Sequence, residues 1–243
     1  MALEFGTTAQ AAADHAVKVL VYGGPGMGKT SLCATAPKPI ILSAESGLLS
    51  LSKQNIERMF GVNTPGITYD IPFIQIRTVD DLMQAFSMVA NDPNCVQFKT
   101  ICLDSITEIA ETLLANAKRT VKDPRQAYGE LLEKMVMTVK AFRDLPGRHI
   151  YVAAKMEPSK DEVTGLTTYG PAMPGQKLGP QLPYLFDEVF RLGVNKDAQG
   201  NPYRFLQTGP DLQYTAKDRS GVLSPVEPPN LSYLFTKITG VSQ

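Results

Sequence analysis

Short apolar runs alternate with longer mixed stretches through the first two thirds of the chain. Five runs rich in apolar and β-branched residues predict buried strands, at residues 17–22, 40–42, 73–76, 98–103 and 150–154. The stretches between them contain the expected helices, at about residues 29–36, 80–90, 106–120 and 126–143. Strands that alternate with helices indicate βαβ units and a mainly parallel sheet.

The last third of the chain has a different pattern. Residues 188–194 and 203–207 predict two strands, and the turn at 197–201 joins them into an antiparallel hairpin. A last strand is expected at 214–216 and a terminal helix at 231–238. Residues 157–183 contain four glycines and five prolines, too dense for a regular element, which predicts a long functional or mobile loop.

Composition narrows the class of protein. Hydrophobic residues make up 43% of the 243 and charged residues 20%, which is ordinary for a soluble globular protein. The 24 basic and 24 acidic residues cancel, which excludes a polycation that coats nucleic acid by bulk charge but is compatible with a local basic groove. Cys33, Cys95 and Cys102 show no CxxC pairing and fit buried thiols in a reducing compartment. No apolar run approaches the ~20 residues that span a bilayer.

These observations predict a cytoplasmic protein without membrane contact. Residues 1–15 are expected to form an N-terminal arm, and residues 16–243 a single domain, because no linker divides the rest of the chain.

A phosphate-binding motif lies between the first predicted strand and the helix that follows it. It reads Gly23-Gly24-Pro25-Gly26-Met27-Gly28-Lys29-Thr30. In a loop of this kind backbone N–H groups meet phosphate oxygens at a helix N-terminus, the lysine reaches the β and γ phosphates, and the threonine hydroxyl ligates Mg²⁺. We count Ser31, the next residue, among the nucleotide contacts. The motif has the strand-then-helix context that it requires, so we expect a nucleoside triphosphate, ATP with Mg²⁺, to bind and be hydrolysed here.

Two acidic residues follow predicted strands. Asp104 comes after 98–103, where a carboxylate holds Mg²⁺ through its water shell; an Asp-Ser pair after a strand is also a common helix N-cap, with Ser105 as the cap. Glu45 follows 40–42, where it can orient and deprotonate the water that attacks the γ-phosphate, the alternative being a solvated loop glutamate. Because parallel strands end at one edge of a sheet, the P-loop, Glu45 and Asp104 are expected along the same edge.

A pair of cations, Lys217 and Arg219, closes the last predicted strand. Side chains alternate along a strand, so a Lys-x-Arg pair projects to one side. An arginine there can neutralise charge on a γ-phosphate. The spacing fits two exposed surface cations as well.

The order of these motifs resembles the RecA-like ATPase core. The Lys-x-Arg pair is similar to the finger pair that DnaB-type helicases, RadA and KaiC insert into a neighbouring subunit's site. Residues 40–48, 128–131 and 186–189 look most like phage-encoded AAA_24-type nucleotide-binding proteins, a RecA-like group that includes single-strand annealing proteins. The resemblance covers about residues 16–240. It implies an α/β fold, with a P-loop core around a mainly parallel sheet and a C-terminal antiparallel hairpin extension.

The resemblance also implies a role for each matching residue. Lys29 and Thr30 would contact phosphate and metal, Glu45 would be the catalytic base, Asp104 would hold the metal, and Lys217 and Arg219 would act in trans. A site shared in this way implies head-to-tail assembly of the chain into a ring or filament. The chain departs from the pattern at Lys155, where relatives carry a Gln or His that senses the γ-phosphate; lysine donates hydrogen bonds but cannot accept them.

RecA-like proteins bind DNA through two loops, and the corresponding segments here are about 119–128 and 157–183. Residues 118–143 carry seven cations against three acids, and Tyr128 and Tyr169 are placed to stack on bases. We therefore expect an ATP-dependent phage-type recombination or annealing protein, in the host cytoplasm if phage-encoded, that binds single-stranded DNA. The predicted contacts are Arg119, Lys122, Arg125 and Tyr128.

Other functions fit the same sequence. A solvated helix face and a Pro/Gly lid explain the two segments equally well. A second function is a regulatory or helicase-loading ATPase that acts on a protein partner, such as a helicase, a replication factor or a single-strand-binding protein, with the long loop as a docking surface. A small-molecule kinase is a weaker alternative, because no Arg-rich lid follows the pattern.

Overall fold

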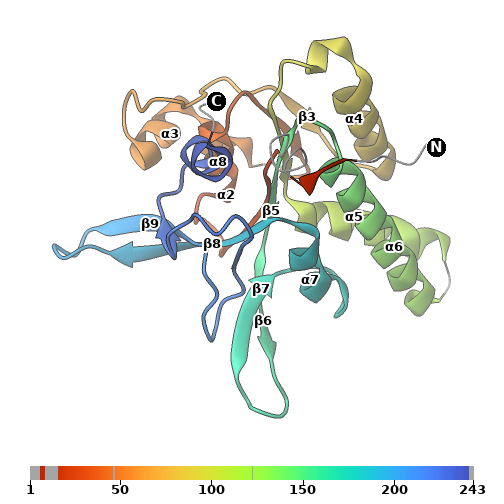
Figure 1. Cartoon of the computed structure of the whole chain (residues 1–243). Helices are drawn as coiled ribbons and strands as arrows, with labels where there is room; N and C mark the ends of the chain where they lie inside the picture. The colour runs from red at the N-terminus through yellow and green to blue at the C-terminus, as the bar shows by residue number, and fades with distance from the viewer. Residues whose placement is uncertain (1–5, 9–15, 46, 122, 241–243) are drawn as a thin grey trace.

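The predicted apolar strands form the centre of one sheet in the computed structural model, which describes residues 6–8, 16–45, 47–121 and 123–240. Six strands run parallel in the order β8-β1-β5-β4-β2-β3 (Figure 1). In that order their bounds are Glu188–Lys196, Lys18–Tyr22, His149–Ala154, Thr100–Asp104, Pro39–Ser43 and Phe73–Gln75. Every residue of β1, β2, β4 and β5 is buried, which is why these strands are continuous apolar runs rather than alternating ones.

Helices cover both faces of the sheet (Figure 1). One face packs against α4 (Val79–Asn91), α5 (Ile106–Thr120) and α6 (Pro124–Arg143), and the other against α2 (Lys29–Leu32) with η1 (Cys33–Thr35) and α8 (Leu231–Thr239). Successive strand residues alternate between the two cores, Leu20 facing the first and Val21 the second. No helix among the described residues is long and apolar enough to cross a bilayer.

The predicted helices begin at, or within two residues of, the positions that the sequence predicts. Thr78 and Asp81 form a capping box at the start of α4, and Ser105 caps α5. Asp123 accepts a hydrogen bond from the backbone N–H of Arg125, and Pro124 follows as the first residue of α6. The mixed stretch after β2 contains two elements for which the pattern gives no signal, η2 (Leu48–Leu51) and α3 (Lys53–Phe60). A short η3 (Pro93–Cys95) precedes β4.

The antiparallel extension is present, but its last strand lies elsewhere than predicted. β9 (Pro202–Gln207) pairs with β8, and β11 (Val226–Glu227) pairs with β9. The strand expected at 214–216 is wrong: β10 is Lys217–Asp218 and pairs with the first residues of β8. The Tyr22 hydroxyl donates to the Thr215 carbonyl, and the Thr215 N–H donates to the Tyr169 carbonyl. The N–H and the carbonyl of Thr215 are therefore bonded to a backbone group outside the main sheet and to a side-chain hydroxyl, so they do not pair with the backbone of a strand of that sheet.

The prediction of an irregular loop at 157–183 is also wrong. The segment contains a hairpin of β6 (Met156–Lys160) and β7 (Thr167–Pro171), which projects from the body of the molecule, followed by α7 (Leu178–Gln181) and η4 (Leu182–Leu185) (Figure 1). Both strands of a two-stranded hairpin are edges, so Pro158 and Pro171 are tolerated. Gly165, with φ of 71°, supplies the left-handed turn residue.

A buried carboxyl lies where β8 and β10 pair. Glu188 is 1% exposed, its Oε1 accepts from the Ser220 N–H, and its Oε2 has no hydrogen-bond partner. Burial, and then the neighbouring charge of Asp218, raise the pKa of Glu188 to about 8. The folded chain therefore keeps this carboxyl protonated at a pH where the unfolded chain, with a glutamate pKa of 4.5, has already released the proton.

We predict that the free energy of unfolding falls as the pH rises through about 5 to 8, because Glu188 binds a proton more tightly in the folded state. Glu188→Gln keeps the shape and cannot ionise, so it should flatten this dependence by about 3 kcal/mol across the interval. Urea unfolding at several pH values measures the effect, with the exposed Glu162→Gln as the control. Equal slopes for wild type and Glu188→Gln would show that Glu188 is ionised in the folded chain.

Candidate nucleotide-binding site

The P-loop lies at the carboxyl end of β1 and leads into α2. Gly26 and Gly28 have φ values of 69° and 103°, in the left-handed region that other residues rarely adopt. Space is limiting at Gly23, where a Cβ would lie 2.8 Å from the Leu192 carbonyl oxygen. Glycine is therefore required at these positions for the loop to form.

Lys29 lies inside this loop. Its Nζ donates to the carbonyl oxygens of Gly23 and Gly24, at 2.9 and 3.0 Å. Burial lowers the pKa of Lys29, while Glu45 and Asp104 raise it. The Tyr151 hydroxyl donates to the Lys29 carbonyl at 2.7 Å and fixes the start of α2 from β5. The ammonium group is thus held where the phosphates of a bound nucleotide would lie.

Asp104 is the last residue of β4 and is 1% exposed. Burial raises the pKa of Asp104 to about 6, although a hydrogen bond with the Thr30 side chain lowers it in part. Its Oδ2 is buried and has no hydrogen-bond partner. A carboxylate oxygen without a partner, beside a threonine hydroxyl, is the hard-oxygen donor set that Mg²⁺ accepts, so these residues fit the predicted metal.

The described residues contain no group of three or more His, Cys, Asp or Glu side chains that would hold a metal ion. Mg²⁺ does not need one, because in nucleotide sites it keeps several waters and binds substrate phosphates.

Glu45 stands just beyond β2 and is held in place by Ser105. The Ser105 hydroxyl donates to Glu45 Oε1 at 2.7 Å, and its oxygen accepts from the Glu108 N–H as the N-cap of α5. The sequence suggests only the capping role for Ser105. The structure brings the P-loop, Glu45 and Asp104 to one edge of the sheet, as the strand order predicts.

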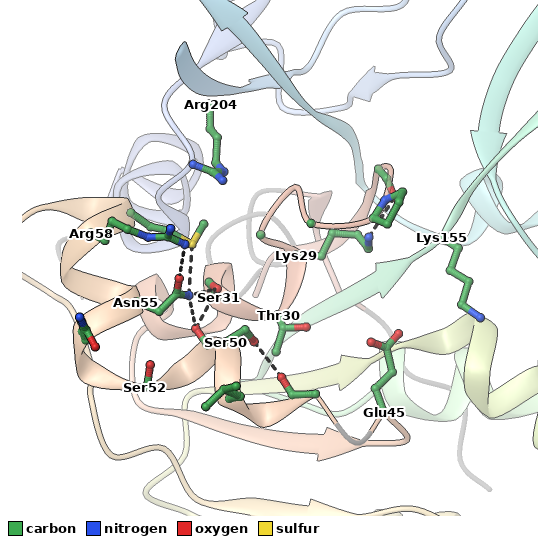
Figure 2. Close-up of a pocket in the computed structure, with 18 of the residues that line it drawn as sticks. Lys29, Thr30, Ser31, Glu45, Ser50, Ser52, Asn55, Arg58, Lys155 and Arg204 are labelled. Atoms are coloured by element: carbon green, nitrogen blue, oxygen red, sulfur yellow. Dashed lines mark hydrogen bonds between the residues drawn. The ribbon is translucent and has the colours of Figure 1, made fainter. Parts of the chain in front are cut away.

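Lys155 follows β5, which lies between the P-loop strand β1 and the strand of Asp104. Its Nζ forms ion pairs with Glu108 and with Glu111, the latter at 3.3 Å, and these contacts raise the pKa of Lys155 against the effect of burial. The side chain lines the same cavity as Lys29 and Glu45 (Figure 2).

The cavity has a volume of about 930 Å³, within the range of small-molecule sites. Lys29, Glu45 and Lys155 lie at one side of it, and Arg204 together with α3 at the other (Figure 2). Arg204 Nε donates to the Met27 carbonyl at 2.8 Å, across 177 residues of sequence. The residues of α3 that line the cavity include Asn55, Arg58 and Met59. Sequence reasoning missed this side, because β9 and α3 carry no motif.

Lys217 and Arg219 lie at the amino ends of the parallel strands, which we call the amino edge of the sheet, opposite the carboxyl edge that carries the P-loop. β10 pairs with Glu188 and Val189 at the start of β8, whereas the P-loop follows the end of β1. Lys217 Nζ donates to the carbonyl oxygens of Pro183 and Phe186. The structure therefore does not bring this pair to the cavity of its own chain.

The residues predicted to contact DNA cluster at the junction of α5 and α6. Arg119, Arg125 and Tyr128 are exposed there. Lys122, like Ser46 and most of the predicted arm at 1–15, lies outside the described residues.

Comparison with known proteins places the chain in a family. Residues 15–220 match the model of the AAA_24 family, described as an AAA domain. The chain belongs to this family. Membership confirms the resemblance to AAA_24-type proteins, and the strand order confirms the α/β fold class with its mainly parallel sheet. No curated protein sequence matches the chain.

Two solved structures are similar to this AAA_24 chain. The flagellar accessory protein FlaH from Methanocaldococcus jannaschii has a TM-score of 0.44 and 12% identity, with 88% of this chain and 84% of that chain covered. The KaiC-like protein PH0186 from the hyperthermophilic archaeon Pyrococcus horikoshii OT3 has a TM-score of 0.38 and 15% identity, with 78% and 77% covered.

We predict that Glu45→Gln separates nucleotide binding from hydrolysis. The amide keeps the shape and can still accept from Ser105, but it cannot take a proton, so turnover should fall by ~10² or more while ATP still binds. ATP turnover and nucleotide titration measure the two effects, with Glu57→Gln on α3 as the control. Wild-type turnover in Glu45→Gln would place the base elsewhere.

Proposed function

We propose that this AAA-family chain hydrolyses ATP and couples hydrolysis to single-stranded DNA, as a phage-type recombination or annealing protein. The supporting observation is that the two segments predicted to contact DNA, 119–128 and 157–183, meet in space. A Cβ on Gly175 would lie 3.1 Å from a ring carbon of Tyr128. The start of α6 and residues 174–178 line a cavity of about 550 Å³, whose lining includes Arg125, Tyr128 and Lys177. We name it the α5–α6 pocket, because it lies on α6 beside the junction with α5.

The chemistry of the α5–α6 pocket suits a nucleic-acid strand. Tyr128 is 40% exposed, and Lys118 Nζ lies 5.2 Å from its ring centroid. Exposed cations neutralise phosphates, and an exposed aromatic ring beside them stacks on bases. Neither contact reads the base sequence. Tyr169, the second aromatic predicted to stack, has one ring face against Tyr214, with the centroids 5.2 Å apart. Tyr128 is therefore the better platform.

A hydrogen-bonded node links the α5–α6 pocket to the nucleotide cavity. The Lys155 N–H donates to the Thr107 hydroxyl, which donates to the Ala172 carbonyl, and the Ala172 N–H returns to the Lys155 carbonyl. Lys155 lines the nucleotide cavity, and Ala172 leads directly into residues 174–178 of the α5–α6 pocket. This route supports coupling between nucleotide and DNA.

Hydrolysis depends on the residues at the carboxyl edge of the sheet. Lys29 binds phosphate oxygens, and Glu45, oriented by Ser105, accepts the proton of the attacking water. Thr30 and Asp104 would hold Mg²⁺, which neutralises phosphate charge when bound.

Assembly completes the proposal. Since Arg219 lies at the opposite edge of the sheet from the cavity of its own chain, a second copy packed head to tail would bring Arg219 to that cavity. Contacts of this heterologous kind generate rings or filaments.

A second candidate is a regulatory or helicase-loading ATPase that acts on a protein partner. One observation favours it: an apolar groove of about 310 Å³ between α4 and α6, where Met83 and Met137 are 57% and 64% exposed. Exposed apolar surface of this kind often marks protein contacts.

We predict that replacing Arg119, Arg125 and Lys177 together with alanine weakens binding to single-stranded DNA. Each lost phosphate contact should reduce the salt slope by ~0.7, because fewer counterions are released. Anisotropy of a labelled oligo-dT at several salt concentrations, with and without ATP, measures the slope. The matched control replaces the exposed Arg77, Lys99 and Lys196, which removes the same charge outside both predicted DNA segments. An unchanged salt slope would favour the second candidate, an ATPase that acts on a protein partner, over DNA binding.

A mixing experiment tests assembly. Arg219→Ala and Glu45→Gln should each hydrolyse ATP slowly, since a trans-acting cation is worth ~10³ or more in other NTPases. Their mixture should recover activity, because some interfaces pair an intact Glu45 with an intact Arg219. ATPase rate against mixing ratio, under conditions that allow subunit exchange, gives the answer. A strictly additive line, with wild-type activity independent of concentration, would confine the site to one chain.

A further inference from the structure

Lys217, the first residue of β10, and Arg219, which follows β10, are held by one short segment, residues 183–187, which runs from η4 to the start of β8. Lys217 Nζ donates to the Pro183 and Phe186 carbonyls, and Arg219 Nη1 pairs with Asp187 Oδ1 at 2.8 Å. The contacts differ in kind. Lys217 is half-buried and bound to two backbone oxygens of its own chain, whereas Arg219 meets a single carboxylate. Lys217 thus anchors β10, and Arg219 is the residue that projects.

Asp187 is itself firmly placed. Its N–H donates to the Lys18 carbonyl at 3.0 Å, which ties it to the start of β1. The Asp187 side chain is 12% exposed, and that of Arg219 is 60% exposed. A fixed, mostly buried carboxylate therefore holds one corner of an exposed guanidinium, and a guanidinium has five N–H donors in a planar fork. Donors remain for the oxygens of a phosphate.

We propose that Asp187 is a positioning residue that orients Arg219 at the amino edge of the sheet for the γ-phosphate end of the nucleotide cavity in a second copy of this chain. The inference rests on the proposed head-to-tail assembly. An exposed arginine that follows a two-residue strand samples many rotamers, and an ion pair to a fixed carboxylate limits them before the neighbour arrives. Misplacement of a transition-state contact by about 1 Å can cost as much as ~10² in rate.

The test uses the full chain with Asp187→Asn, which keeps the size and removes the charge. We expect kcat to fall ~10- to 100-fold, with KM for ATP unchanged because the P-loop lies at the other edge. Asp187→Glu keeps the charge and should retain more activity than Asp187→Asn. The matched control is Asp144→Asn, on the same face, where Asp144 pairs with Arg143 at 2.7 Å; it should behave as wild type.

Complementation separates positioning from a general structural role. Asp187→Asn mixed with Glu45→Gln should recover activity, since it lacks only the residue given to a neighbour. Asp187→Asn mixed with Arg219→Ala should not recover, because both damage the same side of the interface. Recovery with both partners, recovery with neither, or an Asp187→Glu variant no better than Asp187→Asn would overturn the inference.

The activity of Arg219→Ala alone shows whether a negative result concerns the shared site or only the role of Asp187. Full activity in Arg219→Ala would remove the shared site and this inference with it. Loss of activity in Arg219→Ala, together with full activity in Asp187→Asn, would overturn only the role of Asp187.

Discussion

Parallel pairing of β1, β5, β4 and β2 is the constraint on which the site depends. The registers place Tyr22 beside Ala154, Leu103 beside Val152, and Ser43 beside Asp104. These four strands therefore end at nearly the same level, and their last residues and the loops after them converge at one edge. That edge carries the P-loop, Lys155, Asp104 and Glu45. No long-range recognition between the loops is needed, because the hydrophobic burial that aligns the strands also aligns the chemistry.

The same alignment buries charged side chains, and the free chain does not give all of their polar atoms a hydrogen-bond partner. Asp104 has a pKa raised to about 6 by burial and an oxygen without a partner, while burial lowers the pKa of Lys29. Charged groups removed from water in this way weaken the fold unless they are paired. A ligand that brings both cation and phosphate charge would pair them, so its binding would stabilise the folded state by mass action. The site thus gives up some stability of the free chain for affinity.

The sequence predicts the local part of this site and not the tertiary part. Residues 23–30, Asp104 and Glu45 can be found because each follows an apolar strand, and strand ends share an edge. Arg204 carries no such signal, because its contact with Met27 joins a hairpin to the P-loop across 177 residues. The hairpin at 156–171 escapes prediction for a different reason: proline and glycine density argues against a central strand but not against two edge strands. Helix α3 escapes it because the stretch around it has no clear apolar period.

The proposed shared site would use the second edge of the sheet as well. Asp187 hydrogen-bonds to Lys18 at the start of β1, so Arg219, paired with Asp187, lies level with Lys18. The P-loop begins after Tyr22, four residues further along the strand, about 13 Å at ~3.3 Å per residue. Arg219 is also directed to Asp187, at the opposite edge from the cavity. Lengthening the side chain would not close that separation, because β1 is the rigid centre of the sheet. A site that uses both edges requires a second copy, whose amino edge meets the carboxyl edge of the first.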